Sequence, residues 1–450
     1  MSSTSALLAD AARRASAYLE TLAQRPVAPS STAVERLSAL NGPLPDGPSD
    51  PAEVVAELDR YISPATMAMA GPRFFGFVIG GALPVTVAAG TLATAWDQNS
   101  AKWAPTPGTA ALEQVALRWV VEALGLPGSV GGGFVTGATV ANFTALAAAR
   151  HAVLARRGWD IEARGLFAAP PIQVVVGEEV HVSVLKALAM LGLGRDRVGR
   201  VPVDGQGRLR PEALPALDGP AIVCLQAGNV NTGAFDPASE VIARAREAGA
   251  WVHVDGAFGL WAAAAPRHAH LTAGLADADS WATDAHKWLN VPYDSGLALV
   301  RDGAALRAAM GVSAAYLPEE GVRDPADFTP ELSRRARGVE VWAALRALGR
   351  SGLADLIERC CRHARRFAEG LVAGGHQVLN EVVLNQVLVS FGGEERTRHI
   401  IAAIQADGTC WCGGTVWQGH TAMRISVSSW ATTDDDVERS LEAILRAARA

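Results

Sequence analysis

The chain has 450 residues, of which 49% are hydrophobic and 19% charged, with a formal net charge of -6. This length predicts two or three structural units rather than one compact core. The lack of a basic excess argues against nucleic acid as a partner. The N-terminus shows no basic start followed by an apolar run, so we expect no secretory signal. Glycines and Pro84 interrupt the longest uncharged stretch, residues 74–96, which predicts a buried core segment and no membrane span.

The cysteines point to a reducing compartment. There are five of them, an odd number without a C-x-x-C pair: Cys224, Cys360, Cys361, Cys410 and Cys412. This usage favours a cytoplasmic protein over a disulfide framework. Cys410 and Cys412 have no His/Cys partner pair at zinc spacing, so we expect no metal site.

Residues 1–70 predict helices without a core of their own. An amphipathic helix is expected over 7–22, followed by a Pro-, Ser- and Gly-rich loop over 28–50. A second helix is expected over 51–61, with Asp50 as its cap before a proline at the first position. We expect this segment to pack on the main body or on a second subunit.

Residues 71–310 alternate between helical and β-like runs. A helix is predicted over 109–124, strands over 172–176, 198–203, 221–225, 251–255, 280–283 and 296–300, and further helices over 182–191 and 237–248. Asp236 and Pro237 are expected to open the last of these helices. Several strands are almost entirely apolar, which indicates a mainly parallel sheet buried on both faces in an α/β architecture.

Residues 311–450 predict a smaller α+β unit. The expected elements are a loop over 316–330, a long helix over 340–373, strands over 383–391 and 423–428, and a last helix over 437–448. Thr433 and Asp436 resemble a capping pair at the start of that helix.

Two stretches are candidates for ligand binding at the sheet edge. Residues 131–142 are small and lead into a helix near Thr139, where free backbone N–H groups bind anions such as phosphate. An ordinary glycine-rich turn would look the same. His181 precedes a helix, in a loop expected at the carboxyl edge of the sheet. A structural, hydrogen-bonded histidine is the alternative there.

Asp255 closes the hydrophobic strand in Trp251–Gly259. An ionised carboxylate at such a position needs a cationic or strong donor partner, since burying it unpaired is costly. A protonated heteroaromatic nitrogen would serve. The alternative is an aspartate that caps the next turn.

Lys287 lies in Trp281–Asn290 and is one of only three lysines, with Lys102 and Lys186. Arginines stay protonated and do not form imines, so few residues could supply an amine nucleophile. Apolar neighbours desolvate an ammonium and lower its pKa, although a surface lysine in a turn is also compatible. An anion cradle, a ring-facing histidine, an acidic partner and an amine, in this order, are what pyridoxal phosphate requires.

These motifs also carry a family resemblance. From about Pro72–Phe77 to Met423–Ser426 the chain resembles the group II pyridoxal-phosphate-dependent amino-acid decarboxylases, the family of aromatic-amino-acid, glutamate and histidine decarboxylases. The most specific parts are His253-Val254-Asp255-Gly256-Ala257 and Asp284-Ala285-His286-Lys287-Trp288.

The resemblance implies the aspartate-aminotransferase fold, fold type I. Residues 1–70 would form a helical segment that packs on a dimer partner. Residues 71–310 would form a large cofactor domain with a mainly parallel seven-stranded sheet. Residues 311–450 would hold a mobile loop and a small α+β domain. The active site would lie at the interface of a homodimer.

The resemblance also assigns roles around the cofactor. Lys287 would bond its aldehyde, Asp255 would hold its pyridinium proton, and His181 and Ala257 would cover the two faces of its ring. The phosphate would be bound by Ala138 and Thr139, with help from His286. Lys287, His181 and Asp255 are therefore the expected catalytic residues.

Further residues are implied by the same comparison. Asn229 or Asn231, in a loop near the cofactor, would contact it, and the choice between them stays open. Arg424 matches an arginine that faces the substrate carboxylate. Phe77 and Trp103 match a region lining the substrate pocket, which favours an aromatic or apolar side chain.

The implied reaction is decarboxylation of an L-amino acid to its amine and CO2. The family commonly uses a loop tyrosine to return a proton to Cα, but residues 322–330 contain Phe328 and no tyrosine. Tyr316 lies earlier, at a position that does not match. Decarboxylation-coupled oxidative deamination to an aldehyde, transamination and carbon–carbon lysis on the same fold therefore stay open, as does the identity of the amino acid.

Overall fold

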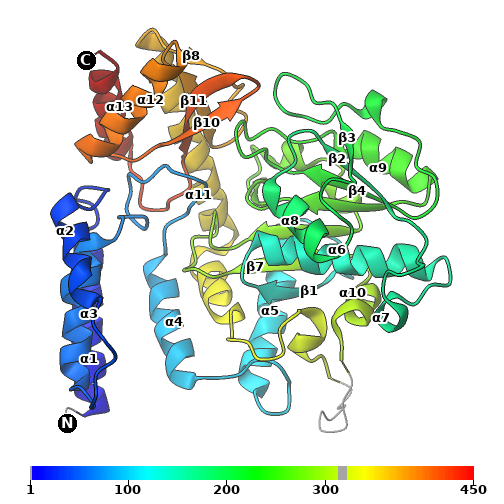
Figure 1. Cartoon of the computed structure of the whole chain (residues 1–450), viewed down its shortest axis with the longest axis horizontal. Coiled ribbons are helices and arrows are strands. Elements are labelled where there is room, and N and C mark those ends of the chain that lie inside the picture. Colours follow the sequence, from blue (N-terminus) through cyan, green and yellow to red (C-terminus); the bar gives the residue numbers. More distant parts are fainter. Residues whose placement is uncertain (1–2, 313–321, 450) are drawn as a thin grey trace.

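The computed structural model describes residues 3–312 and 322–449. Figure 1 shows a large sheet with its helices, a smaller sheet with α12 and α13 beside it, and α1–α3 standing at the outer side of α4. The long helix α11 runs between the two sheets. No helix in the described ranges is long and apolar enough to span a membrane.

The large sheet has seven strands in the order β1-β7-β6-β5-β4-β2-β3. Their bounds are β1 Gly131–Val135, β2 Gln173–Gly177, β3 Gly199–Val201, β4 Ala221–Gln226, β5 Trp251–Asp255, β6 Ser280–Asp284 and β7 Gly296–Val300. Only β7 runs against its neighbours, β1 and β6. The predicted mainly parallel seven-stranded sheet is confirmed, and the carboxyl ends of six strands meet at one edge, where such sheets bind ligands.

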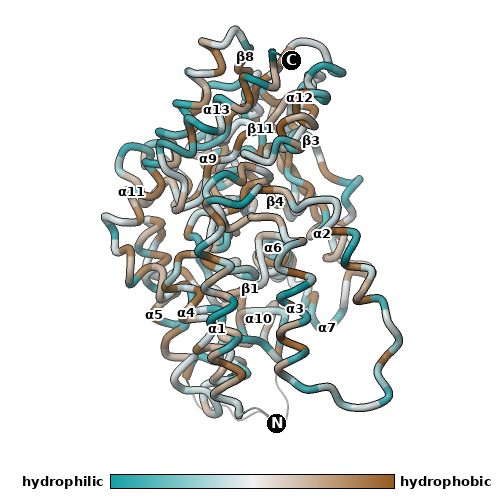
Figure 2. Tube along the Cα trace, turned by 90° about the vertical axis from the view of Figure 1, so that its left-hand side faces the viewer, coloured by the Kyte–Doolittle hydropathy of each residue, from teal (hydrophilic) through white to brown (hydrophobic). Residues whose placement is uncertain are grey.

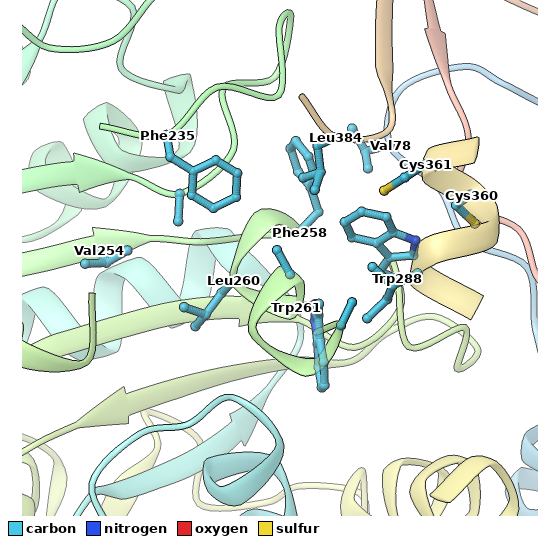
Figure 3. Close-up of a cluster of buried hydrophobic side chains, with 14 of the residues drawn as sticks. Val78, Phe235, Val254, Phe258, Leu260, Trp261, Trp288, Cys360, Cys361 and Leu384 are labelled. Carbon is cyan, nitrogen blue, oxygen red and sulfur yellow. The ribbon is translucent and has the colours of Figure 1, made fainter. Parts of the chain in front are cut away.

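Helices cover both faces of this sheet. One face carries α6 Ala138–Ala155, α7 Ile161–Arg164, α8 Val182–Met190 and α10 Gly303–Met310, and the other α5 Pro107–Ala123, α9 Ala238–Glu247 and α11 Gly338–Ala373. Successive strand residues point to opposite faces, so Ile222 packs on the first side and Val223 on the second. Figure 3 shows how the core on this second face continues from Phe258 and Trp288 to Cys360 and Cys361 of α11.

The glycines before α6 form strand β1, which we did not predict. A Cβ on Gly132 would lie 2.6 Å from the carbonyl oxygen of Ala298 in β7, and one on Gly133 would lie 2.5 Å from that of Phe328. Glycine is needed in β1 because other backbone segments pass this close to it. That requirement comes from the tertiary structure, and local composition does not reveal it.

Asp236 does not cap α9, contrary to our expectation. Pro237 occupies the cap position without a side-chain hydrogen bond. The carboxylate of Asp236 instead accepts hydrogen bonds from the backbone N–H groups of Leu209 and Gln226, both at 2.7 Å. Burial raises the pKa of Asp236 to about 6. Its role is to join the chain after β3 to the end of β4.

The N-terminal helices are largely exposed. They are α1 Thr4–Thr21, α2 Ser31–Glu35, α3 Pro51–Ala65 and α4 Pro84–Trp96. Asp50 caps α3 as predicted, accepting from the N–H of Ala52 at 3.0 Å. No residue of α1, α2 or α3 is buried, and α4 buries only Thr86. The prediction that residues 74–96 form a buried core segment is therefore wrong over α4 within one chain.

The smaller sheet is antiparallel, with the order β10-β11-β9-β8. The elements here are β8 Gln377–Val378, β9 Gln386–Ser390, β10 Gly413–Trp417, β11 His420–Ser426, α12 Glu394–Asp407 and α13 Asp434–Arg449. Thr433 and Asp436 exchange backbone-to-side-chain hydrogen bonds, which confirms the predicted capping pair. β8 and β10 were not predicted, and α11 bends at Gly349, where φ is 59°.

Short 3-10 helices make up the remaining regular structure. They are η1 Arg36–Leu40, η2 Pro211–Ala213, η3 Gly259–Ala264, η4 Ala269–Thr272, η5 Leu275–Asp277 and η6 Pro325–Phe328. η6 lies in the stretch that we expected to be a loop.

Candidate active site

A pocket opens at the carboxyl edge of the large sheet. Its lining comes from the ends of β2, β4, β5 and β6 and from the segment before α4: Val78, His181, Gln226, Gly228, Val230, Asp255, Ala257, Phe258 and Lys287. The sheet topology thus gathers His181 after β2, Asp255 and Ala257 at the end of β5, and Lys287 after β6 around one cavity. Apolar side chains line part of this cavity.

Lys287 follows β6 and is held by Asp284. Its Nζ lies 2.8 Å from Asp284 Oδ2. The Asp284 side chain is 2% exposed, and its Oδ1 has no hydrogen-bond partner in the described part of the chain. Asp284 is the nearest anion to the predicted amine nucleophile, yet we assigned it no role from the sequence. The available signal was a carboxylate three residues before the lysine at the end of a buried strand.

His286 is neutral and fixed in orientation. Its Nδ1 accepts a hydrogen bond from the N–H of Ser295 at 3.1 Å, so the ring proton lies on Nε2. Nε2 lies 3.7 Å from Asp284 Oδ2, and the ring of Tyr293 stacks on the imidazole at 4.2 Å. Burial lowers the pKa of His286. The imidazole is therefore a neutral donor beside Asp284.

The start of α6 faces His286. Gly137 occupies the cap position and offers no side-chain cap, so the first N–H groups of the helix, beginning at Ala138 and Thr139, lack intrahelical partners. A Cβ on Gly137 would lie 3.1 Å from His286 Cε1. A helix start and an imidazole donor this close together suit an anionic group such as phosphate.

Asp255 is an ionisable acceptor inside the pocket. Its side chain lies at the end of β5 with the residue 5% exposed. Oδ2 accepts from Asn142 Nδ2 at 3.2 Å and from the Ser183 hydroxyl at 3.4 Å, and Oδ1 accepts from the N–H of Ala257 at 3.2 Å. These three groups hold the side chain in place and leave it able to pair with a protonated nitrogen in the cavity.

His181 caps α8 and is oriented by Ser183. Its Nδ1 lies 3.2 Å from the N–H of Ser183 and 2.7 Å from the Ser183 hydroxyl. Burial lowers the pKa of His181, so the imidazole is neutral at neutral pH. A neutral, fixed ring beside Asp255 suits stacking on a planar ligand.

The loop after β4 reaches the pocket through Gly228 and Val230. Asn229 Oδ1 accepts from the N–H groups of Asn231 and Thr232, and Asn229 Nδ2 donates to Glu179. Asn231 Oδ1 accepts from the Thr415 hydroxyl. The Asn229 side chain thus uses both its oxygen and its nitrogen within the protein, and Asn231 uses its oxygen. A cofactor contact of either residue stays a prediction.

The predicted substrate residues differ in their surroundings. Arg424 on β11 donates to the carbonyl oxygen of Val230, a pocket residue, and no carboxylate lies within 4 Å of it among the described residues. Burial lowers its pKa to about 10, so it is a cation at neutral pH. Phe77 is 57% exposed and stacks on Trp411, and the backbone N–H of Trp103 donates to the Asp324 carboxylate. Neither aromatic ring lines the pocket within one chain.

Together these residues fit pyridoxal phosphate. An uncapped helix start with a neutral histidine suits the phosphate, a buried carboxylate with three donors suits the pyridinium nitrogen, and the amine of Lys287 suits the aldehyde. When bound, this cofactor withdraws electrons from the bonds at the substrate Cα.

The family follows from comparison with known proteins. The model of the pyridoxal-dependent decarboxylase conserved domain matches residues 34–392. The chain belongs to this family. It is 31% identical over 386 residues to a tyrosine decarboxylase of Oryza sativa subsp. japonica, covering 79% of this chain and 70% of the relative. It is 29% identical to an aromatic-L-amino-acid decarboxylase of Bacillus atrophaeus, over 76% of this chain and 72% of the relative.

Solved structures share the whole fold. An Oryza sativa TDC with PLP and tryptamine superposes with a TM-score of 0.90 at 24% identity, covering 99% of this chain and 97% of that one. The fold-type prediction is thereby confirmed. The chain is a pyridoxal-phosphate-dependent amino-acid decarboxylase, a carboxy-lyase, as the resemblance implied.

Proposed function

We propose that this decarboxylase acts on an L-amino acid with an aromatic or apolar side chain and releases the amine and CO2. The observation that carries this proposal is the position of Arg424 next to pocket residue Val230, as a partly buried cation without an anionic partner among the described residues. The apolar lining by Val78, Val230 and Phe258 supports an apolar side chain. The names of the tyrosine and aromatic-amino-acid decarboxylase relatives agree with it.

Each residue of the site has a separate role, which depends largely on its charge. Arg424 binds the substrate carboxylate in a planar, two-point contact. Asp255 keeps a proton on the ring nitrogen of the cofactor, which stabilises negative charge developing in the transition state. Asp284 holds the ammonium of Lys287 whenever the lysine is free, and His181 keeps the flat ligand in place. Loss of CO2 then requires a proton to be returned to the substrate carbon.

Aldehyde formation is the second candidate, and Phe328 favours it. The ring of Phe328 has no proton to donate and packs under the guanidinium of Arg323 at 4.3 Å, outside the pocket lining. Tyr316 lies outside the described residues. A Rhodiola rosea 4-hydroxyphenylacetaldehyde synthase shares the fold, with a TM-score of 0.85 at 22% identity. An unprotonated carbon would be oxidised by O2, which is reduced to hydrogen peroxide, and hydrolysis by water would then release aldehyde and ammonia after the loss of CO2.

Product analysis tests both candidates. Holoenzyme is incubated with single L-amino acids, in air and without oxygen, and CO2, amine, aldehyde and peroxide are measured. We expect CO2 and amine in equal amounts from aromatic or apolar amino acids, independent of oxygen. Oxygen-dependent aldehyde and peroxide would establish the second candidate. Turnover that needs a keto acid and releases no CO2 would contradict both.

Replacing Arg424 tests the substrate carboxylate contact. Losing a charge-assisted hydrogen bond costs about 1.5–3 kcal/mol, so Arg424→Met is expected to raise KM about 10- to 100-fold. Arg424→Lys keeps the charge but loses the planar guanidinium, so its KM should lie between those of the wild type and Arg424→Met. Steady-state kinetics with the preferred amino acid measure this. An unchanged KM in Arg424→Met would remove Arg424 from substrate binding.

We also propose that two chains form a homodimer through the N-terminal face. The exposed apolar residues of α1, α3 and α4 include Leu8, Leu19, Val54, Leu58, Ile62, Val85, Leu92 and Trp96. Figure 2 turns this side toward the viewer. Large apolar residues exposed on several helices of one face mark an interaction site in soluble proteins. A second copy would bury the helices that have no core within one chain.

A charge in the middle of α4 tests this interface. Leu92 is 54% exposed, so Leu92→Glu should leave the chain folded and weaken self-association by about 10-fold or more, because it buries a charge. Val372→Glu, at an equally exposed position on α11, is the matched control. Sedimentation velocity gives the dissociation constant. A wild-type chain that stays monomeric at micromolar concentration would contradict the proposal.

A further inference from the structure

A buried chain of hydrogen bonds runs from the core of the sheet to Asp255. Asn142, His253 and Ser280 are fully buried, and Trp251 is almost so. Trp251 Nε1 lies 2.8 Å from Ser280 Oγ, Ser280 Oγ lies 2.9 Å from His253 Nδ1, and His253 Nε2 lies 2.8 Å from Asn142 Oδ1. Asn142 Nδ2 then reaches Asp255 Oδ2 at 3.2 Å. The path joins β5, β6 and α6.

In this relay of hydrogen bonds, from Trp251 to Asp255, the donor and the acceptor of each bond can be assigned. Asp255 as a carboxylate only accepts, so the Asn142 amide points its Nδ2 toward Asp255 and its Oδ1 toward His253. His253 Nε2 must then donate. Burial lowers the pKa of His253 to about 3, so the ring is neutral and its Nδ1 is an acceptor. The Ser280 hydroxyl therefore donates to Nδ1, and the Trp251 indole, which only donates, satisfies Ser280 Oγ.

The same asparagine also connects to the catalytic histidine, His181, through Ser183. Asn142 Nδ2 lies 3.2 Å from Ser183 Oγ, and Ser183 contacts both Asp255 and His181. An Asn142 flip would place its NH2 group against the His253 Nε2–H and its oxygen against the Asp255 carboxylate. Both encounters are unfavourable in a buried site, so the relay locks one orientation.

We propose that Asn142, His253 and Ser280 are positioning residues that fix Asp255 as an ionised acceptor for the cofactor's ring nitrogen. The inference rests on the pyridoxal phosphate assignment and goes beyond it, since none of the three lines the pocket. The effect of replacing each residue on cofactor affinity should become smaller with the number of hydrogen bonds that separate the residue from Asp255. Asn142 is the first, His253 the second and Ser280 the third.

Three variants test this order. Asn142→Asp keeps the shape and the oxygen facing His253 but replaces the donor to Asp255 by a second carboxylate oxygen. His253→Leu removes the donor that orients Asn142, and Ser280→Ala removes the hydroxyl at the far end. Ser440→Ala deletes an equally buried hydroxyl from α13, which bonds only to its own helix, and is the matched control.

The readout is the dissociation constant of pyridoxal phosphate, from tryptophan fluorescence of resolved and reconstituted enzyme. A lost hydrogen bond to a charged group changes affinity about 10- to 100-fold, which we expect for Asn142→Asp, with about 10-fold for His253→Leu and about threefold for Ser280→Ala. Ser440→Ala should match wild type. KM should stay within about twofold in all variants while kcat falls in the same order.

Two results would overturn the proposal. One is cofactor affinity unchanged in all three variants with only the melting temperature lowered, which would make the relay purely structural. The other is an effect of Ser280→Ala as large as that of Asn142→Asp. If Asn142→Asp does not fold, the comparison of His253→Leu with Ser280→Ala decides. A wild-type enzyme that binds no pyridoxal phosphate would instead refute the cofactor assignment.

Discussion

Replacing Lys287 by alanine is expected to abolish the visible absorbance of the bound cofactor and to lower kcat at least about a thousandfold, since Lys287 is the only lysine at the pocket. The amine sits beside Asp284 at 2.8 Å, at the end of a buried strand. No arginine can replace it, because the guanidinium does not form an imine. Absorbance spectra and steady-state rates of the purified variant measure both effects.

Lys186→Ala is the matched control. Lys186 is exposed on α8, away from the pocket lining, and its loss should change neither the spectrum nor the rate. A Lys287→Ala enzyme that keeps a borohydride-reducible chromophore would show that another amine holds the cofactor.

The second large effect is expected for Asp255→Asn. The amide keeps the shape but carries no charge, so it no longer holds a proton on the ring nitrogen. Loss of one preorganised charge from a water-excluded site lowers kcat about a hundred- to a thousandfold. We expect the cofactor to bind more weakly, because Asn142 Nδ2 would then face either an oxygen or a second NH2 group. Single-turnover CO2 release and the cofactor dissociation constant measure the two effects.

Asp436→Asn separates these effects from general damage to the fold. Asp436 is almost as buried as Asp255 but lies at the start of α13, where it pairs with Arg73. Its replacement should lower the melting temperature and leave cofactor affinity unchanged. Equal losses of kcat in the two variants would mean that Asp255 has no specific role.

Local sequence patterns were sufficient for the strands that build the site. β5 and β7 have the predicted bounds, because continuous apolar runs between turns are typical of strands buried on both faces. The capping pair Thr433 and Asp436 was predictable for a similar reason, since its hydrogen bonds join residues three positions apart. The strand-end position of Asp255 followed directly from the strand prediction.

Features that depend on distant contacts were not predictable. β1 was missed because its glycines are required by the close approach of Ala298 and Phe328, which lie more than 160 residues further along the chain. Asn142 reaches Asp255 across 113 positions, and only its polarity inside an apolar helix distinguished it. Asp236 had the sequence signature of a helix cap, but two backbone N–H groups in its tertiary surroundings bind it instead.

The exposure of α4 has a different physical origin. Its composition is that of a buried segment, yet Leu92 and Trp96 face outward in one chain. Burial predicted from sequence does not distinguish the core of a chain from an interface between chains. The proposed homodimer reconciles the composition of α4 with its exposure.

The most direct test is to locate the cofactor on the chain. Holoenzyme is reduced with borohydride and digested, and the modified peptide is identified by mass spectrometry. We predict a single pyridoxyl group on the peptide that contains Lys287, beside Asp284 and His286. A pyridoxyl group on Lys102 or Lys186, or none on any peptide, would contradict the assignment on which the proposed function rests.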